Sequence, residues 1–365
     1  MAYRSRFADP PPRRPGRLRL MLPAITVGVM SVALCGFWLY ASWKTGSEID
    51  GWLAREASLG RNWTCPDRKI AGFPFRIELS CTTPSFEGSA EGRGISGTLG
   101  RVLAVAQIYT PSHVIIEAES PLVVRERRGG TEWRLAWEGS LRASVIGQPG
   151  KLDRIAVQVT SPVLSGTVPD GTPVAFRARE AEAHLRRTPD RPQADGAFDV
   201  AVTIDKASVP PLDALLRGGD PTDANLVMTL THAEPFSGRG LPAELDRWRE
   251  AGGRLQLTTL TLSKGAKRID ASGNLGLDDM RRPQGRVELS LTGLEEVLQS
   301  MGLSNRSAGI GGLIAGVLTG RRPAQPAEPA PGTAAAPRGV VLPLRLESGR
   351  AYLGPIPVAP LPPLY

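Results

Sequence analysis

The chain has 365 residues, a formal net charge of +8 and three cysteines. Residues 1–19 hold six arginines and one aspartate, a net charge of +5, which leaves +3 for the other 346 residues. The body of the chain is therefore close to neutral, and no basic stripe with interleaved aromatic residues runs through it. We expect no nucleic-acid partner, because binding to phosphates requires such a basic surface.

Residues 20–43 form an apolar segment that contains no charged side chain. A helix of this length reaches roughly 36 Å at about 1.5 Å per residue, enough to cross the hydrocarbon core of a bilayer. Basic flanks are retained in the cytoplasm, so residues 1–19 are predicted to be a cytoplasmic tail. The sequence thus predicts a single-pass inner-membrane protein with a transmembrane helix at 20–43 and the bulk of the chain in the periplasm.

Two other interpretations of the apolar segment were weighed. A cleaved signal peptide has an apolar core of only about 7 to 15 residues that ends at small residues, whereas this segment continues through bulky aromatic rings. A lipid-modified Cys35 would require a very small residue at position 34, where this chain has Leu34. The sequence favours an uncleaved membrane anchor over both.

The residues after the anchor divide into four segments. Residues 44–62 carry apolar residues at helical spacing and predict a juxtamembrane amphipathic helix that continues from the anchor. Residues 63–319 are predicted to form a β-rich periplasmic domain, and residues 320–339, rich in Pro and Ala, a flexible segment. Residues 340–365 are predicted to add a hairpin and a Pro-rich tail, either docked or free, to the same domain.

Alternation of apolar and polar residues at period two is the dominant pattern beyond residue 76 and predicts antiparallel strands. Between Leu257 and Leu260 the alternation slips by one residue, which predicts a β-bulge. Short helices are expected only at 211–216, 242–251 and 294–301. The fold class is therefore mainly β: a transmembrane helix followed by a long, curved antiparallel meander that forms either a groove or a sandwich. The alternating residues are Ile77, Leu79 and Cys81; Ile155, Val157 and Val159; Phe198, Val200, Val202 and Ile204; Leu226, Met228 and Leu230; Val287, Leu289 and Leu291; and Leu342, Leu344 and Leu346.

Cys65 and Cys81 lie in the exported part of the chain, and a disulfide is the expected state of such a pair in an oxidising compartment. A loop of this size contributes about 3 kcal/mol, mainly by restricting the unfolded chain. A redox pair or half of a metal site was the alternative, but the Cys-x-x-Cys spacing is missing. Cys35 is interpreted as a small apolar residue of the anchor.

Catalytic and metal-binding patterns are missing from the sequence. The three histidines, His113, His184 and His232, have no plausible ligand set beside them. Neither a nucleophile elbow nor a phosphate-binding loop is present. We therefore expect no enzyme, no catalytic residue, no metal and no cofactor.

The segment Gly72-Phe73-Pro74-Phe75-Arg76, after an anchor and a short helix, resembles the signature of the bacterial domain-of-unknown-function 2125 family. The segment 348–357, with Gly349, Gly354 and Pro355, is similar to the C-terminal pattern of that family. The family has no assigned catalytic residues, so the resemblance implies none here, and we expect Phe73 and Phe75 to be structural packing anchors. More remotely, residues 253–294 are similar to the C-terminal pattern of AsmA-like envelope proteins, which implies lipid handling along an apolar groove.

Two main hypotheses of function follow, beside a minor third one of a hydrolase whose site is assembled from distant residues. In the first, the sheet binds or transfers lipid or acyl chains along an apolar face in maintenance of the envelope, because strands with one apolar face must bury it on something. In the second, two sheets cover each other and the protein is a structural or interaction module without a ligand. An apolar face with an open rim would favour the first hypothesis and a closed sandwich the second. The sequence identifies no protein partner.

Overall fold

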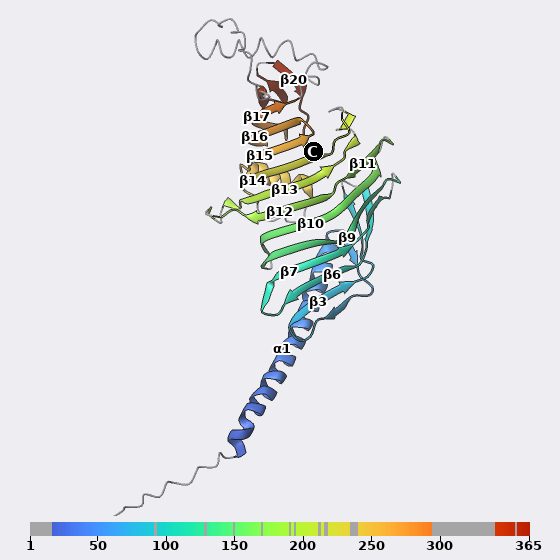
Figure 1. Cartoon of the computed structure of the whole chain (residues 1–365), viewed down its shortest axis with the longest axis vertical. Coiled ribbons are helices and arrows are strands. Elements are labelled where there is room, and N and C mark those ends of the chain that lie inside the picture. Colours follow the sequence, from blue (N-terminus) through green and yellow to red (C-terminus); the bar gives the residue numbers. More distant parts are fainter. Residues whose placement is uncertain are drawn as a thin grey trace, which may run out of the picture.

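The computed structural model describes residues 17–293 and 340–365, apart from positions 91–92, 128–129, 149, 169–170, 190, 193–194, 211–212, 215–217, 234–239 and 355. Over these residues a long N-terminal helix is followed by one antiparallel sheet of twenty strands and a short helix (Figure 1). The predicted mainly β class is confirmed, and the sheet is open.

The N-terminal helix α1 (Arg17–Ser58) is continuous over 42 residues. It contains the predicted anchor and most of the predicted juxtamembrane helix. By length and composition it is able to cross a membrane, although a signal sequence near an N-terminus has the same properties. The last turns of α1 pack on the start of the sheet, where the rings of Trp52 and Trp63 are 5.9 Å apart.

Beside α1 the sheet is divided into two branches. One branch contains β2 (Lys69–Ala71), β3 (Arg76–Cys81), β6 (Val102–Gln107) and β7 (Thr110–Glu119). The other contains β1 (Asn62–Thr64), β4 (Ser85–Ala90), β5 (Arg93–Leu99) and β8 (Leu122–Glu126). Both join β9 (Glu132–Gln148), whose first residues pair with β8 and whose last residues pair with β7.

The best-buried core lies where these branches face each other. Ala118, Trp137 and Val159 are its most buried members, with exposed fractions of 5%, 7% and 9%. The indole Nε1–H of Trp137 donates a hydrogen bond to the carbonyl oxygen of Ala118, 3.2 Å away. Leu99 and Leu122 of the second branch pack against this cluster. The two branches therefore cover each other locally, at the end of the sheet nearest to α1.

Above β9 each strand pairs with the next along the chain, so that the upper sheet is a simple meander (Figure 1). Its one departure is β11, which pairs with β10 beside β12. The strands are β10 (Lys151–Thr167), β11 (Pro173–Arg177), β12 (Glu180–Arg187), β13 (Phe198–Ala207), β14 (Thr222–Leu230), β15 (Leu255–Lys264), β16 (Lys267–Leu277), β17 (Pro283–Thr292), β18 (Val340–Glu347), β19 (Arg350–Leu353) and β20 (Ile356–Pro360).

The alternating segments of the sequence are strands in the structure. The predicted bulge is also confirmed, because the pairing of β15 with β16 shifts between Leu257 and Leu260. The helix expected at 242–251 is α3 (Leu241–Glu250), between β14 and β15. The segments expected to be helical at 211–216 and 294–301 lie mostly or wholly outside the described residues, as does the segment 320–339.

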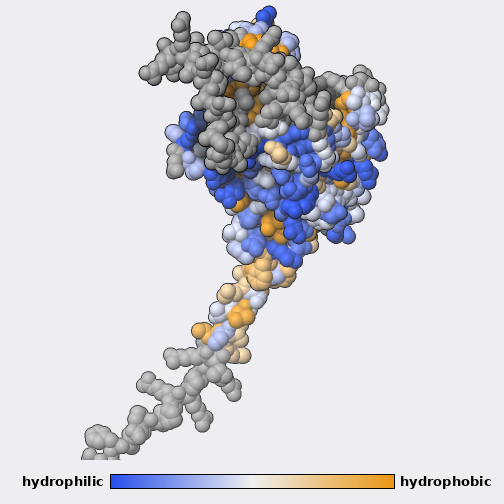
Figure 2. All heavy atoms as spheres, turned by 45° about the horizontal axis from the view of Figure 1, so that its top comes forward, coloured by the Kyte–Doolittle hydropathy of each residue, from blue (hydrophilic) through white to orange (hydrophobic). Residues whose placement is uncertain are grey.

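The surface differs in character between the helix and the sheet. Figure 2 shows α1 with mainly apolar residues along its length, below a sheet whose surface is mainly hydrophilic in this view. Several large apolar side chains of α1 are more than half exposed, among them Met30 at 69% and Val32 at 73%. An apolar helix exposed to this extent is compatible with a membrane anchor or with a signal sequence.

Candidate functional site

One face of the sheet is apolar along its whole length. Residues directly opposite each other on paired strands share a face of the sheet. The pairings connect one residue from each of fourteen strands, from β3 to β20, into a line that we call the central row. The central row consists of Ile77, Ala106, Val114, Val145, Ile155, Leu185, Val200, Met228, Leu257, Gly273, Val287, Leu344, Leu353 and Ile356.

The central row holds no polar side chain and is long. Thirteen steps between neighbouring strands, each about 4.8 Å, give it a length of about 62 Å. Only Ile77 and Val287 are buried, with exposed fractions of 9% and 7%, and most of the other members are half-buried. This apolar face therefore keeps contact with its surroundings along most of its length.

The opposite face has a different chemistry. An equivalent line of paired residues crosses twelve strands there, and ten of the twelve side chains are polar or charged. It consists of Ser80, Leu103, Glu117, Arg142, Gln158, Glu182, Thr203, Asn225, Thr261, Asp270, Ser290 and Val341. Because water solvates this face, the sheet as a whole is amphipathic, and the apolar face is where a ligand with low polarity would bind.

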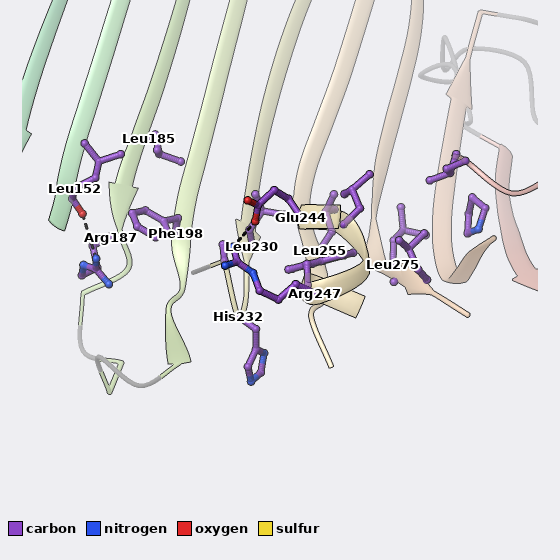
Figure 3. A pocket seen from close by; sticks show the side chains of 17 residues that line it. Leu152, Leu185, Arg187, Phe198, Leu230, His232, Glu244, Arg247, Leu255 and Leu275 are labelled. Atoms are coloured by element: carbon purple, nitrogen blue, oxygen red, sulfur yellow. Dashed lines mark hydrogen bonds and ion pairs between the residues drawn. The ribbon is translucent and has the colours of Figure 1, made fainter. Parts of the chain in front are cut away.

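A cavity of about 680 Å³ lies beside the central row, between α3 and the sheet, and we call it the α3 pocket. Five of its lining residues are directly opposite one another on β12 to β16: Arg187, Phe198, Leu230, Leu255 and Leu275. Figure 3 shows these side chains side by side, with α3 packed across them. The volume falls within the range of pockets that bind small molecules.

The charged side chains of the α3 pocket are few: two arginines and one glutamate. Arg187 donates a hydrogen bond from Nη2 to the Leu152 carbonyl at 3.2 Å, and its guanidinium lies 4.9 Å from the centre of the Phe198 ring. Its Nε–H is buried and has no hydrogen-bond partner among the described residues. The nearest carboxylate, that of Asp153, is 3.8 Å away, beyond hydrogen-bonding distance.

The helix contributes a second arginine to the pocket. Arg247 of α3 forms an ion pair with Glu244, whose side chain is almost fully buried (Figure 3). Trp248 anchors the helix, because its Nε1–H donates a hydrogen bond to the Thr231 carbonyl at 2.8 Å. The exposed ring of His232 lies at the mouth. The pocket thus combines an apolar interior with cationic groups, a chemistry suited to an apolar chain that ends in an anionic group.

The predicted cysteine pair is a disulfide in the structure, and it connects Cys65 with the end of β3 at Cys81. Asp67, between the two cysteines, accepts a hydrogen bond from the backbone N–H of Thr82 at 3.0 Å. A hydrogen bond from the Thr82 side chain, together with this backbone one, holds the pKa of Asp67 below its ordinary value. Cys35 is a free thiol on the exposed surface of α1.

The segment from Gly72 to Arg76 forms the turn between β2 and β3. Gly72 has a φ of +99°, and a Cβ there would lie 2.7 Å from the Arg76 carbonyl oxygen, so the turn requires glycine. The peptide bond between Phe73 and Pro74 is cis. Phe73 and Phe75 are 56% and 60% exposed. The expectation that both rings are packing anchors is therefore wrong, because neither ring is packed in the core of the sheet. Phe73 does contact α1.

The glycines of the C-terminal pattern lie in turns next to β19. Gly349 follows Ser348 in the two-residue turn between β18 and β19, and both have positive φ, +74° and +51°. Such a turn matches the twist of a hairpin. Gly354 ends β19 with a φ of +59°, and its N–H donates a hydrogen bond to the Pro343 carbonyl. Pro355 lies outside the described residues.

Sequence reasoning did not find the α3 pocket. Phe198 and Leu230 were part of the alternating pattern, but the pattern does not show which strands pair or in which register. Arg187, Glu244 and Arg247 carry no local signal, because charged residues are common at strand ends and on exposed helix faces. Their convergence depends on the folding of α3 across the sheet, which only the three-dimensional structure shows.

An apolar N-terminal helix followed by one open, amphipathic antiparallel sheet defines the class of this protein. The chain belongs to the family described as uncharacterized proteins conserved in bacteria (DUF2125), which matches it over residues 38–362. No curated protein and no solved structure matches the chain. The family match covers all the strands of the sheet together with the C-terminal half of α1.

Proposed function

We propose that this protein is anchored in the bacterial inner membrane by α1 and binds the acyl chains of lipids on the apolar face of its sheet. The observation that carries the proposal is the central row, an uninterrupted apolar line about 62 Å long. Transfer of apolar surface from water to a bound acyl chain is favourable by about 25 cal/mol for each Å². A half-buried row of this length therefore gains most when a chain-like apolar ligand covers it.

The α3 pocket supports the same proposal and indicates which end of a lipid it holds. Leu230, Leu255 and Leu275 offer an apolar wall. The buried Nε–H of Arg187 is a donor without a partner among the described residues, and such a group gains a hydrogen bond from a phosphate or carboxylate oxygen. We propose that the pocket holds the anionic headgroup end of a lipid, with an acyl chain along the neighbouring strands.

The proposed location agrees with the chemistry of the chain. The arginines of residues 1–19 favour a cytoplasmic N-terminus, which places the sheet in the periplasm. A disulfide between Cys65 and Cys81 is typical of that oxidising compartment. The remote similarity of residues 253–294 to AsmA-like envelope proteins, a segment that contains β15 to β17, also favours lipid handling. In this proposal the protein binds or transfers lipid and catalyses no reaction.

Photocrosslinking in the full-length protein tests the proposal. A benzoyl-phenylalanine replaces Met228 of the central row in one variant and Asn225, on the opposite face of the same strand, in the matched control. Cells grown with radioactive phosphate are irradiated, and the purified protein is examined for covalently bound phospholipid. We expect adducts at position 228 and few at position 225. Equal adducts at the two positions, or none at either, would contradict lipid binding on the apolar face and favour the interaction module.

A further inference from the structure

Three exposed aromatic rings lie together at the end of the sheet nearest to α1. Phe73 and Phe75 belong to the turn before β3, and Tyr109 belongs to the turn between β6 and β7. Their exposed fractions are 56%, 60% and 69%. The backbone N–H of Ile108 donates a hydrogen bond to the Phe75 carbonyl at 3.0 Å, which holds the two turns side by side. We call these three rings the aromatic rim.

The aromatic rim is fixed at a defined level of α1. Trp38 donates a hydrogen bond from Nε1 to the Arg76 carbonyl at 2.9 Å. Its ring also meets that of Phe73 edge to face, with the centroids 5.5 Å apart. Trp38 stands six residues before Lys44, the first charged residue after the apolar run, which corresponds to about 9 Å along the helix. The rim therefore lies beside apolar helix, below the first charged residue.

When α1 spans a membrane, the position of the aromatic rim along α1 determines the depth at which the three rings lie relative to the lipids. Apolar groups of interfacial helices enter the boundary between headgroups and acyl chains by about 5–10 Å, and aromatic rings are favoured at that depth. Next to the rim, Arg76 is 60% exposed and pairs with Glu78 at 2.5 Å. Arginine at the edge of an apolar surface keeps its guanidinium at the level of lipid phosphates.

We propose that the aromatic rim is inserted into the periplasmic leaflet of the membrane that α1 spans. The central row begins at Ile77, two residues after Phe75, so the inserted rim lies next to the lower end of the apolar face. The inference rests on the membrane anchoring in the proposed function, and it adds the place at which lipids enter the apolar face. Phe73 and Phe75 are exposed to water in the isolated chain because their partner is the bilayer.

Spin labels in the full-length protein test the insertion. In a Cys35→Ser background, Phe75→Cys or Tyr109→Cys supplies a single reactive thiol, because Cys65 and Cys81 are joined to each other. Met280→Cys, at a position that is also 62% exposed but lies at the turn between β16 and β17, is the matched control. Each protein is reconstituted into vesicles of phosphatidylethanolamine and phosphatidylglycerol, and the access of oxygen and of a water-soluble nickel chelate to the label is measured.

We expect the labels at 75 and 109 to be accessible to oxygen and shielded from nickel, and the label at 280 to show the reverse. Equal access of nickel at all three positions would overturn the insertion. This result is independent of crosslinking at Met228. Lipid adducts at position 228 together with a water-exposed label at position 75 would support lipid binding on the apolar face and refute insertion of the rim. A membrane-inserted label at position 75 without adducts at position 228 would support insertion of the rim and refute lipid binding on the apolar face.

Discussion

The phenol of Tyr365 donates a hydrogen bond to a carboxylate oxygen of Asp246, 3.0 Å away, although 119 positions separate the two residues. Arg281 joins them, because its Nη2 lies 2.8 Å from the carboxylate and its guanidinium lies 5.1 Å from the centre of the phenol ring. The end of the tail is thus docked on α3, and Leu364 is part of the pocket lining. The tail and α3 both contribute residues to the lining of the pocket.

Tyr365→Phe removes this hydrogen bond and keeps the ring on Arg281. Because the phenol is the donor in this hydrogen bond, its loss is expected to make the tail open several-fold more often. Hydrogen exchange at the Leu364 amide, which donates to the Arg281 carbonyl, measures this opening. Tyr109→Phe, at a ring that is 69% exposed, is the control and should leave the exchange at Leu364 unchanged.

The docked tail is also sensitive to pH. Burial acts to raise the pKa of Asp246, but hydrogen bonds from Arg281 and Tyr365 outweigh it, and the net pKa is below the ordinary value. A carboxylate with a lowered pKa stabilises the docked state above its ordinary pKa, and this contribution is lost as the pH falls through the lowered value. We expect the protection factor of the Leu364 amide, which corrects its exchange rate for the intrinsic effect of pH, to fall in acid, and Asp246→Asn to abolish that fall.

The hydrogen bond between Tyr365 and Asp246 is also expected to be lost at high pH. Burial, followed by the charge and hydrogen bond of Asp246, raises the pKa of Tyr365 above its ordinary value. The protonated phenol stabilises docking at every pH below the ordinary pKa of tyrosine. This contribution is lost as the pH rises through the raised pKa of Tyr365. Docking is therefore expected throughout the neutral range. Loss of docking near neutral pH would contradict the assigned contact.

Much of the fold could be predicted from the sequence because each strand carries its own signal. Alternation at period two marked the segments around Ile155, Val200 and Met228 as strands, and the slip after Leu257 marked the bulge. The sequence left open whether the apolar faces meet in a sandwich or form a groove, since period two is the same in both. Pairing across the whole sheet, which decides this question, depends on contacts between distant segments.

The candidate site was less predictable than the fold. The docking of Tyr365 on Asp246 has no local signal, because a Pro-rich sequence does not indicate whether the segment is docked on the domain or free in solvent. Phe73 and Phe75 were expected to be packing anchors because of their chemistry, and only their exposure in the folded chain shows that they form a surface. Sequence patterns predict burial on the assumption that water surrounds the protein, and a rim inserted in a membrane, as we propose, would not satisfy that assumption.

The disulfide between Cys65 and Cys81 is expected to stabilise the lower end of the sheet. A bridge that closes a loop of this size contributes about 3 kcal/mol at 25 °C. We expect the double variant Cys65→Ala and Cys81→Ala to lose roughly that free energy of unfolding, measured by urea denaturation in detergent. Cys35→Ala, at the free and exposed thiol of α1, should change it by less than about 0.5 kcal/mol. If the double variant and Cys35→Ala changed the free energy of unfolding equally, the disulfide would not stabilise the fold.

An open apolar face predicts that one substitution has unequal costs at two positions of the central row. Val200 is half-buried and Val287 is 7% exposed. Val287→Thr buries a hydroxyl and is expected to lower the free energy of unfolding by about 1–3 kcal/mol. At Val200 the hydroxyl remains hydrated, so Val200→Thr should cost less than about 1 kcal/mol, measured by urea denaturation of lipid-free protein.

The same pair separates stability from binding. In cells, Val200→Thr should lower the yield of phospholipid adducts at position 228, because the added hydroxyl weakens the apolar contact without unfolding the sheet. A cost at Val200 equal to that at Val287 would mean that the face is closed in the lipid-free protein, as a structural module with a sealed core would require. Unequal costs together with a reduced yield of adducts would establish that the face is kept open for a ligand.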